Sequence, residues 1–342
     1  MRNPAEETAK QFSNSVEFAQ PHVDAILSQE WSWKADEGRN KKLRARFHQE
    51  AEEENKAKLL MVKAEGSDKL RRALETVVGK NHIVSALPLR EAGWVLGKRF
   101  FRSYLDMKEG KEPQGLEQFC DGCGAEFGAD HALDCDKGGL VHRRHEGLTG
   151  FVAVESEKGF PGVTTKFRLT EVTGEEMMYK SAKTKDGSVP DVRVPGLFDS
   201  CRAAYLDGWV TNTTSSTAMK TTVAQHLKNC EQVKRRFYVE RCNEVEHSDF
   251  APIVTSHLGT CGPAADNWVR RVAAAQCTSM QELSWRVNAL RVGLQFAVVR
   301  GMCECLWGSR KRVKKGTGGW GAAGTADPEA LLVAAGLGTL DD

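Results

Sequence analysis

The stretch Gly187-Ser-Val-Pro-Asp191-Val-Arg-Val194 alternates apolar and polar residues, and Ala203-Ala-Tyr-Leu-Asp207-Gly-Trp-Val-Thr-Asn212 has a similar pattern. Alternation with a period of two is typical of half-buried strands. Pro195-Gly196 and Asp199-Ser200 lie between the two stretches, and residues of these types favour a turn. The sequence therefore predicts two neighbouring strands that are joined by a turn.

The residues that follow change to a helical period. Five apolar side chains fall on one stripe and predict a helix over 216–242: Met219, Val223, Leu227, Cys230 and Phe237. A further strand is predicted from Phe250 to Thr255, and a further helix over 263–276. Strands and helices in this order predict an α+β fold with a mixed sheet flanked by helices.

Helices are also predicted at both ends of the chain. Ser279 and Glu282 form a capping box that begins a long amphipathic helix ending near Trp307. Nearer the start, the residues between 85 and 105 suggest a helix because they are apolar and aromatic. Three charged helices are predicted before it, at 5–20, 39–64 and 67–78, the last one capped by Ser67-Asp68.

Asp191 and Asp207 lie on the two predicted strands, so a hairpin can bring their carboxylates face to face. Two negative charges held close together in a partly dry site repel each other, and a divalent cation relieves that repulsion. Mg²⁺ is commonly bound by one or two carboxylates, and it can polarise a phosphodiester. The pair is therefore a candidate magnesium site, although a Pro-Asp dipeptide is also a common turn former.

An enzyme that hydrolyses phosphodiesters with such a metal site normally also needs a lysine. The lysine orients the attacking water or stabilises the negative charge that develops on the phosphate. The position two residues after Asp207, where that lysine usually lies, is Trp209. Lys228 and Lys234 on the following predicted helix are the substitutes, and Lys234 is the favoured one. Its neighbours Arg235 and Arg236 are candidates for binding phosphate. A solvated helix face is the alternative for each of these three residues.

A second constellation precedes the strands. Cys120, Cys123, His131 and Cys135 have the spacing C-x2-C-x7-H-x3-C. Three thiols and one imidazole at this spacing are typical of a tetrahedral zinc site. Because all four ligands come from the protein, the zinc is expected to be structural rather than catalytic. Gly124 can supply the positive φ that the turn after the first two cysteines needs.

The composition excludes some classes of function. The 342 residues are 40% hydrophobic, which is enough for a packed core, and the net charge of +2 indicates no strongly acidic or basic protein. The apolar stretch Leu283 to Trp307 contains three arginines and a glutamate, so it is too polar to span a bilayer. The polar start of the chain does not resemble a secretion signal, which predicts an intracellular location, nuclear or cytoplasmic.

Basic residues gather in short clusters, which are the usual footprint of proteins that bind phosphate backbones. The clusters are Lys41 to Arg46, Arg143-Arg144, Lys234 to Arg236 and Arg310 to Lys315. Each cluster by itself also fits a solvated helix face or a localisation signal.

These passages together resemble one family, the C-terminal region of non-LTR retrotransposon polyproteins. That region carries a zinc knuckle followed by a restriction-like endonuclease of the PD-(D/E)XK type. The matching passages are Cys120 to His145, Pro190-Asp-Val-Arg-Val194, Leu206-Asp207, Val210-Thr-Asn212, Glu244 to Val254 and Trp307-Gly-Ser-Arg310. The similarity runs from about Ser85 to Arg312, and the cysteine and histidine passage is its most specific part.

The resemblance implies a hydrolase that nicks DNA at an insertion site, with the knuckle and its basic flank gripping the target. DNA is the implied partner and RNA an alternative, while the oligomeric state is left open. Asp191 and Asp207 match the metal-binding acids of the family. The expected divisions are 1–84, charged helices; 85–118, a helical segment; 119–147, the zinc knuckle; 148–312, the restriction-like endonuclease domain; and 313–342, a disordered Gly- and Ala-rich tail.

The chain also departs from the family pattern. The family continues Arg-His with an Asn-Glu and a nearby Asp, whereas this chain has Glu146-Gly147-Leu148, so Glu146, Glu155 or Glu157 would have to replace an acid. No Tyr-x-Asp-Asp motif of a reverse transcriptase occurs in the printed sequence. Two alternatives therefore stand beside the nuclease. One is a nucleic-acid-binding protein that has lost catalysis, and the other is a zinc-stabilised interaction protein that uses its N-terminal helices.

Overall fold

The structure is a computed structural model that describes residues 66–77, 82–169 and 189–311, with the single residues Gln49, Glu53, Val172 and Gly174. The chain divides into two units, Met1–Gly66 and Ser67–Asp342, and the second unit contains nearly all described residues. The helix expected at 5–20, nearly all of the one at 39–64 and the expected tail at 313–342 lie outside the described residues.

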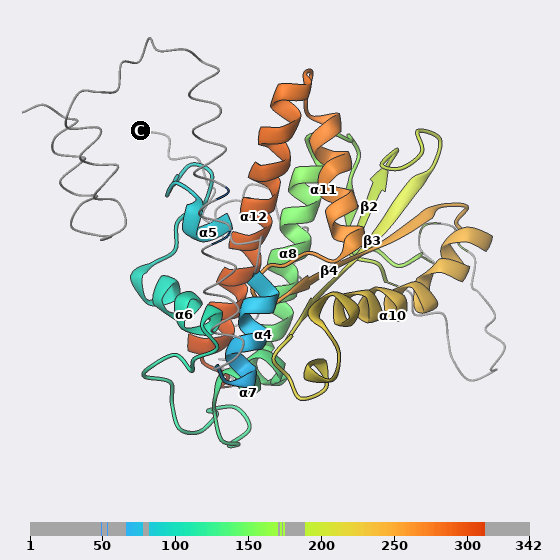
Figure 1. Ribbon diagram of the computed structural model, residues 1–342. Coiled ribbons are helices and arrows are strands. Elements are labelled where there is room, and N and C mark those ends of the chain that lie inside the picture. Colours follow the sequence, from blue (N-terminus) through green and yellow to red (C-terminus); the bar gives the residue numbers. More distant parts are fainter. Residues whose placement is uncertain are drawn as a thin grey trace, which may run out of the picture. The chain divides into compact units, whose positions relative to one another are not determined.

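A mixed sheet of four strands forms the centre of the second unit (Figure 1). Its order is β1 (Thr164–Thr165), β2 (Val192–Pro195), β3 (Ala203–Thr211) and β4 (Asp249–Ser256). β2 is antiparallel to β1 and to β3, whereas β4 runs parallel to β3. The predicted pair of antiparallel strands is confirmed, and so is the strand predicted at 250–255.

Helices precede, follow and connect these strands. They are α4 (Asp68–Val77), α5 (His82–Ser85), α6 (Lys98–Lys108), α7 (Ala129–Asp134), α8 (Leu140–Glu157), α10 (Val223–Glu244), α11 (Pro263–Ala275) and α12 (Met280–Trp307). The Ser279 side chain accepts a hydrogen bond from the backbone N–H of Glu282, which confirms the predicted start of α12. The α+β class that the pattern predicted is confirmed at this level.

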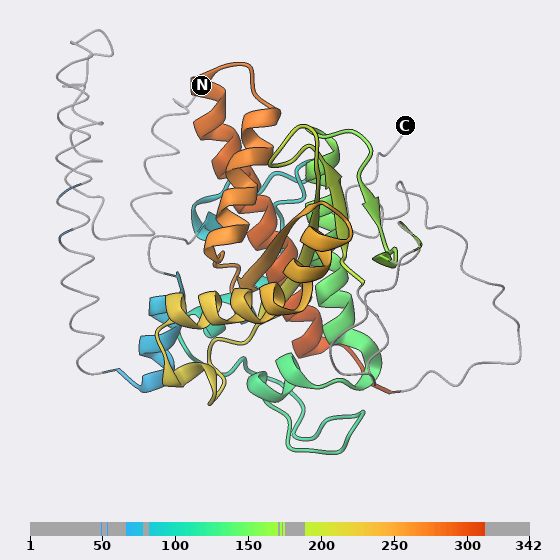
Figure 2. The same ribbon diagram turned by 90° about the vertical axis from the view of Figure 1, so that its right-hand side faces the viewer.

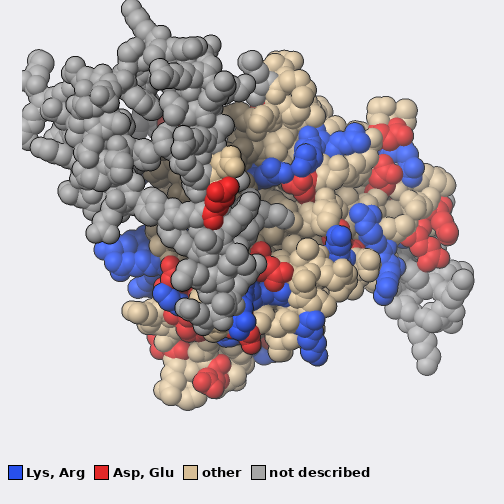
Figure 3. Space-filling model, in the orientation of Figure 1, with Lys and Arg blue, Asp and Glu red and all other residues tan. Residues whose placement is uncertain are grey.

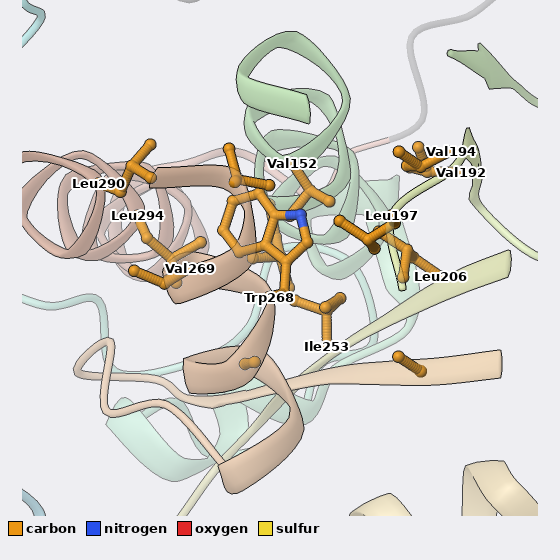
Figure 4. Close-up of a cluster of buried hydrophobic side chains, with 14 of the residues drawn as sticks. Val152, Val192, Val194, Leu197, Leu206, Ile253, Trp268, Val269, Leu290 and Leu294 are labelled. Carbon is orange, nitrogen blue, oxygen red and sulfur yellow. The ribbon is translucent and has the colours of Figure 1, made fainter. Parts of the chain in front are cut away.

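One face of the sheet packs against α8, α11 and α12, while α10 crosses the other face (Figures 1 and 2). The core on the first face surrounds Trp268, which is fully buried among side chains from the sheet and all three helices (Figure 4). The indole N–H of Trp268 donates to the hydroxyl of Ser156 at 3.0 Å, so the polar edge of this large side chain is satisfied inside the core.

The expected helix at 216–242 begins later than its stripe suggested. Thr222 caps α10 at Val223, and residues 218–220 form a separate 3₁₀ turn. Phe237 was expected on the buried stripe, but it is 54% exposed, and the prediction is wrong for this residue. Tyr238 is buried in its place, because the row of α10 that contains Tyr238 is the one that faces the sheet.

Two further segments differ from the expectations. The residues from 85 to 105 do not form one helix, since α5 ends at Ser85 and α6 begins at Lys98, with Pro88 and the positive φ of Gly93 between them. α8 was not expected, and the division placed between residues 147 and 148 falls inside it. Packing against α12 stabilises α8 in spite of the two glycines that it contains.

A membrane span needs a helix that is both long and apolar over its length. None of the helices among the described residues meets both requirements.

Candidate metal centre and acidic site

The first two ligands of the cysteine and histidine motif lie on a tight turn. Gly124 has a φ of +75°, as its place in the motif predicted, and its N–H donates to the carbonyl of Cys120 at 2.8 Å. The N–H of Cys120 donates to the carbonyl of Ala125, also at 2.8 Å, and Phe119 pairs with Glu126 in an antiparallel bridge. The turn therefore directs the two thiols toward α7.

His131 lies on α7 and Cys135 is the residue at its C-terminal end. Cys120 Sγ lies 3.9 Å from Cys135 Sγ, and Cys123 Sγ lies 3.3 Å from His131 Nε2. All four candidate ligand atoms lie within 4.8 Å of one another. A tetrahedral zinc with bonds of about 2.0–2.3 Å would separate its ligands by roughly 3.5–3.8 Å. The four residues therefore form a cluster that could hold a zinc ion.

The two buried thiols of the cluster differ in acidity. Burial raises the pKa of Cys120, but hydrogen bonds from the N–H groups of Cys123 and Gly122 outweigh it and lower that pKa to about 6. Burial raises the pKa of Cys135, and the hydrogen bond from Lys137 opposes that effect only in part. One thiol of the cluster is thus already biased toward the thiolate that binds metal.

The residues that follow α12 hold this cluster from outside. The guanidinium of Arg310 is buried, donates to the carbonyl of Ala132 at 2.9 Å and lies over the ring of Phe127 at 4.9 Å. The N–H of Arg310 donates to a carboxylate oxygen of Asp121, one residue after the first cysteine, at 2.9 Å. The cluster is therefore anchored to the longest helix of the described residues.

The second candidate site lies where β2 and β3 separate. Val192 pairs with Leu206, so Asp191 and Asp207 are neighbours at the start of β2 and in the middle of β3. The Asp191 carboxylate accepts a hydrogen bond from the N–H of Gly208 at 2.7 Å. The structure thus brings the two predicted acids together. The backbone pairing of β2 with β3 ends at Val192 and Leu206, and beyond it the Asp191 side chain accepts the hydrogen bond of the Gly208 N–H.

Lys234 contacts the carboxylate of Asp207 as an ion pair, and its ammonium lies 5.7 Å from the centre of the Trp209 ring. Asp207 is 3% exposed, and burial raises the pKa of its carboxyl while Lys234 opposes that shift and Asp191 adds to it. Lys228, the other candidate, is exposed on α10. The structure therefore places Lys234, rather than Lys228, at the acid pair.

His145 was not predicted as a site residue, and it contacts the same pair. His145 Nε2 lies 2.8 Å from Asp191 Oδ1, so His145 and Gly208 engage different oxygens of one carboxylate. Glu146, next to it on α8, forms ion pairs with Lys166 at 3.1 Å and with His142 at 3.6 Å. The polar residues at 142, 145, 146 and 149 have helical spacing and could have indicated this face, had α8 itself been expected.

The other glutamates that were considered as replacement acids are engaged elsewhere on α8. Glu155 forms an ion pair with Arg286 at 2.7 Å, and Glu157 accepts hydrogen bonds from the N–H groups of Gly162 and Val163. Ten residues of helix separate Glu155 from His145, which corresponds to about 15 Å along the axis. Glu146 is the one of the three that lies beside the acid pair.

The four arginines that were predicted to bind nucleic acid are in different environments. Arg143, Arg235 and Arg236 are exposed, and Figure 3 shows Lys and Arg side chains over α10 on the face drawn. Arg144 needs a correction, because it is 4% exposed and donates to the carbonyl of Val210 at 3.3 Å. Burial lowers its pKa, and its position inside the fold keeps it from a phosphate at the surface.

No protein-family model matches the chain, and no curated protein sequence matches it significantly.

Proposed function

We propose that the protein is a metal-dependent DNA endonuclease of the restriction-like type, which nicks a target site as retroelement endonucleases do. The single observation that carries this proposal is the meeting of Asp191, Asp207 and Lys234 at the point where β2 and β3 separate. The order of a strand with Pro-Asp, a strand with a second acid and then a basic helix is the order expected for that class.

The residues present fit a divalent cation between the two acids. Asp207 Oδ2 is buried, and the ammonium of Lys234 is its ion-pair partner. The repulsion between two neighbouring carboxylates, one of them buried, decreases when a cation binds. When it is bound there, Mg²⁺ supplies the polarisation of a phosphodiester and of a water molecule.

The side chains around the pair have separate roles in this proposal. Lys234 places a positive charge at Asp207, where it stabilises the negative charge that develops on a phosphodiester during attack. His145 and the N–H of Gly208 each bind one oxygen of Asp191 and orient that carboxylate. His145 is therefore a positioning residue, since it acts through Asp191.

The cysteine and histidine cluster supports the same proposal from a second side. In this proposal its four residues hold a structural zinc that maintains the turn at Cys120 and the start of α8. The exposed Arg143 lies on the first turns of that helix and would contact the phosphate backbone. The zinc would thus shape the DNA-binding surface without taking part in hydrolysis.

The test is a nicking assay with the full-length protein, supercoiled plasmid and Mg²⁺ or Mn²⁺. We expect nicking that Asp207→Asn abolishes, while Asp249→Asn, a variant of an acid at the start of β4, retains it. Zinc content and thermal unfolding are measured for each variant, so that a loss of fold is recognised. Nicking that persists in both Asp191→Asn and Asp207→Asn would contradict the proposal.

A second candidate is a nucleic-acid-binding protein without catalysis. One observation favours it: Trp209 occupies the usual place of the lysine, and both oxygens of Asp191 are already bound by protein groups. In that case filter binding detects an affinity for DNA that falls steeply as the salt concentration rises. Wild type and Asp191→Asn bind with equal affinity, and neither protein nicks DNA when a divalent metal is added.

A further inference from the structure

Exposed apolar side chains adjoin the acid pair on two segments of the chain. Val189, two residues before Asp191, is 42% exposed. On α10, Val233 is 52% and Phe237 is 54% exposed, and they lie one residue before and three residues after Lys234. Val233 and Phe237 are four residues apart, and Lys234 and Phe237 three, and residues at these two spacings are neighbours on a helix surface. We call Val189, Val233 and Phe237 the apolar rim.

A buried tyrosine holds the rim in place. The ring of Phe237 packs edge-on against Tyr238 with centroids 4.8 Å apart, and Tyr238 stacks on Phe250 at 4.9 Å. The hydroxyl of Tyr238 donates to the carbonyl of Val189 at 3.2 Å, which ties the two segments of the rim to one side chain. Phe237 is therefore supported by the core from beneath while more than half of its surface is open to solvent.

The charge around the rim indicates what could cover it. Between Val223 and Val239, the one acid of α10 is Glu231, which is buried and accepts a hydrogen bond from the N–H of Ala264 at 2.9 Å. The next acid, Glu240, is exposed three residues after Phe237. Lys228, Arg235 and Arg236 are exposed on the same stretch of the helix. An apolar surface flanked by cations is complementary to a strand that carries phosphates on one side and bases on the other.

A nucleobase fits this combination by its size and chemistry. Every base has a π-face, and base stacking on an aromatic side chain tolerates any sequence. Apolar side chains that contact DNA frequently unstack a base step and act best where the duplex is easily deformed. A paired and stacked base offers no free face, so the rim would distinguish unpaired from paired DNA.

We propose that the apolar rim binds a nucleobase next to the phosphate at the acid pair, with Phe237 stacking on an unpaired or unstacked base. This inference rests on the proposed nuclease function, and it specifies the substrate class as DNA with an unpaired or easily opened step. Phe237 is a specificity residue in this inference, because it contacts the substrate and not the reacting atoms.

The test measures binding separately from nicking. The full-length protein with Asp191→Asn retains an acceptor for the Gly208 N–H and is assayed with zinc but without magnesium. Its ligands are a paired duplex, the same duplex with one mismatched 2-aminopurine, and the single strand. We expect Phe237→Ala to weaken binding to the mismatched and single-stranded DNA roughly ten-fold, and Phe237→Trp to restore it. Binding to the paired duplex should change little.

Fluorescence and a matched control complete the experiment. Stacking should quench 2-aminopurine when the parent protein or Phe237→Trp binds, and Phe237→Ala should not quench it. Trp285→Ala removes an aromatic side chain that is 65% exposed on α12 and should change nothing. Equal binding of all three ligands by Phe237→Ala and its parent overturns the inference, as does a Phe237-dependent association with anionic vesicles or with a second copy. If the wild-type protein does not nick DNA but Phe237 still distinguishes unpaired from paired DNA, only the proposed nuclease function is contradicted.

Discussion

The two candidate sites are built in opposite ways. The cysteine and histidine cluster takes all four ligands from Cys120 to Cys135, so one turn and one short helix assemble it. The acidic site combines Asp191 just before β2 and Asp207 on β3 with Lys234 on α10 and His145 on α8. A local site remains visible in a sequence as a spacing, whereas a site assembled from four elements becomes visible only when the sheet register is known.

The two sites are nevertheless connected by hydrogen bonds and an ion pair that meet at Asp130. Asp130 on α7 accepts hydrogen bonds from Asn212 at 3.2 Å and Thr214 at 3.0 Å, just beyond the end of β3. Lys69 on α4 forms an ion pair with the same carboxylate at 2.9 Å. The cluster is therefore continuous with the fold that positions the acid pair, and its loss should be felt at the sheet.

Removal of the metal is the most severe way to test this difference. Structural zinc contributes about 10–16 kcal/mol of apparent binding free energy in zinc-finger peptides, which equals the entire stability of many domains. We expect about one equivalent of zinc per chain, and chelation or Cys120→Ser should expose the amides of 118–148 in hydrogen exchange. Cys201→Ser, which alters an exposed thiol outside the cluster, is the control. A zinc content far below one equivalent would contradict the assignment.

Acid should lower the stability of the fold through His257, which accepts a hydrogen bond from the N–H of Thr213 beyond the end of β3. Burial, with a contribution from Arg144, lowers the pKa of the fully buried His257 from 6.5 to about 4. The unfolded chain therefore binds a proton near pH 6.5 that the folded chain resists, so stability is complete above pH 6.5 and falls as the pH decreases toward 4. The expected loss is about 3 kcal/mol.

Urea unfolding at a series of pH values measures this effect. His257→Asn retains an acceptor for the N–H of Thr213 and should flatten the slope between pH 6.5 and 4. An unchanged slope in this variant would assign the acid sensitivity to other groups.

Substitutions at two adjacent glycines can distinguish the cost of backbone strain from the cost of losing the contact with Arg310 that anchors the cluster. Gly138 and Gly139 both have a φ of +72°, so alanine should cost about 1–2 kcal/mol of strain at either position. A Cβ at Gly138 would also lie 2.5 Å from Arg310 Cα, whereas a Cβ at Gly139 meets nothing within 4 Å. Gly138→Ala should therefore lose about 2 kcal/mol more than Gly139→Ala in thermal unfolding. Equal losses would mean that the segment around Arg310, after α12, does not hold the cluster.

The smallest expected effect concerns the acid site. His145→Ala should reduce nicking roughly ten-fold and raise the magnesium concentration for half-maximal nicking, because Asp191 loses one of its two orienting bonds. His145→Gln, which can donate to the same oxygen, should recover part of the loss. DNA binding should not change, and a fall in binding equal to the fall in nicking would indicate a structural role instead.

Much of the fold followed from short-range patterns. β3, β4, α11 and α12 lie near their predicted bounds, because alternation, helical period and capping are properties of neighbouring residues. β2 begins at Val192, five residues after the start of the stretch that predicted it. α8 was not predicted, and its glycines at 147 and 150 are unfavourable inside a helix. Its stability comes from α12 and the sheet, which are remote in sequence.

The sequence by itself determined the four ligands of the metal cluster and the presence of two acids on adjoining strands, because spacing and alternation are local. Only the tertiary structure decided that Lys234 meets Asp207, that His145 binds Asp191, and that Phe237 is open to solvent. The physical reason is that a side chain's exposure, and the acidity of its groups, depend on elements that pack against it from distant parts of the chain.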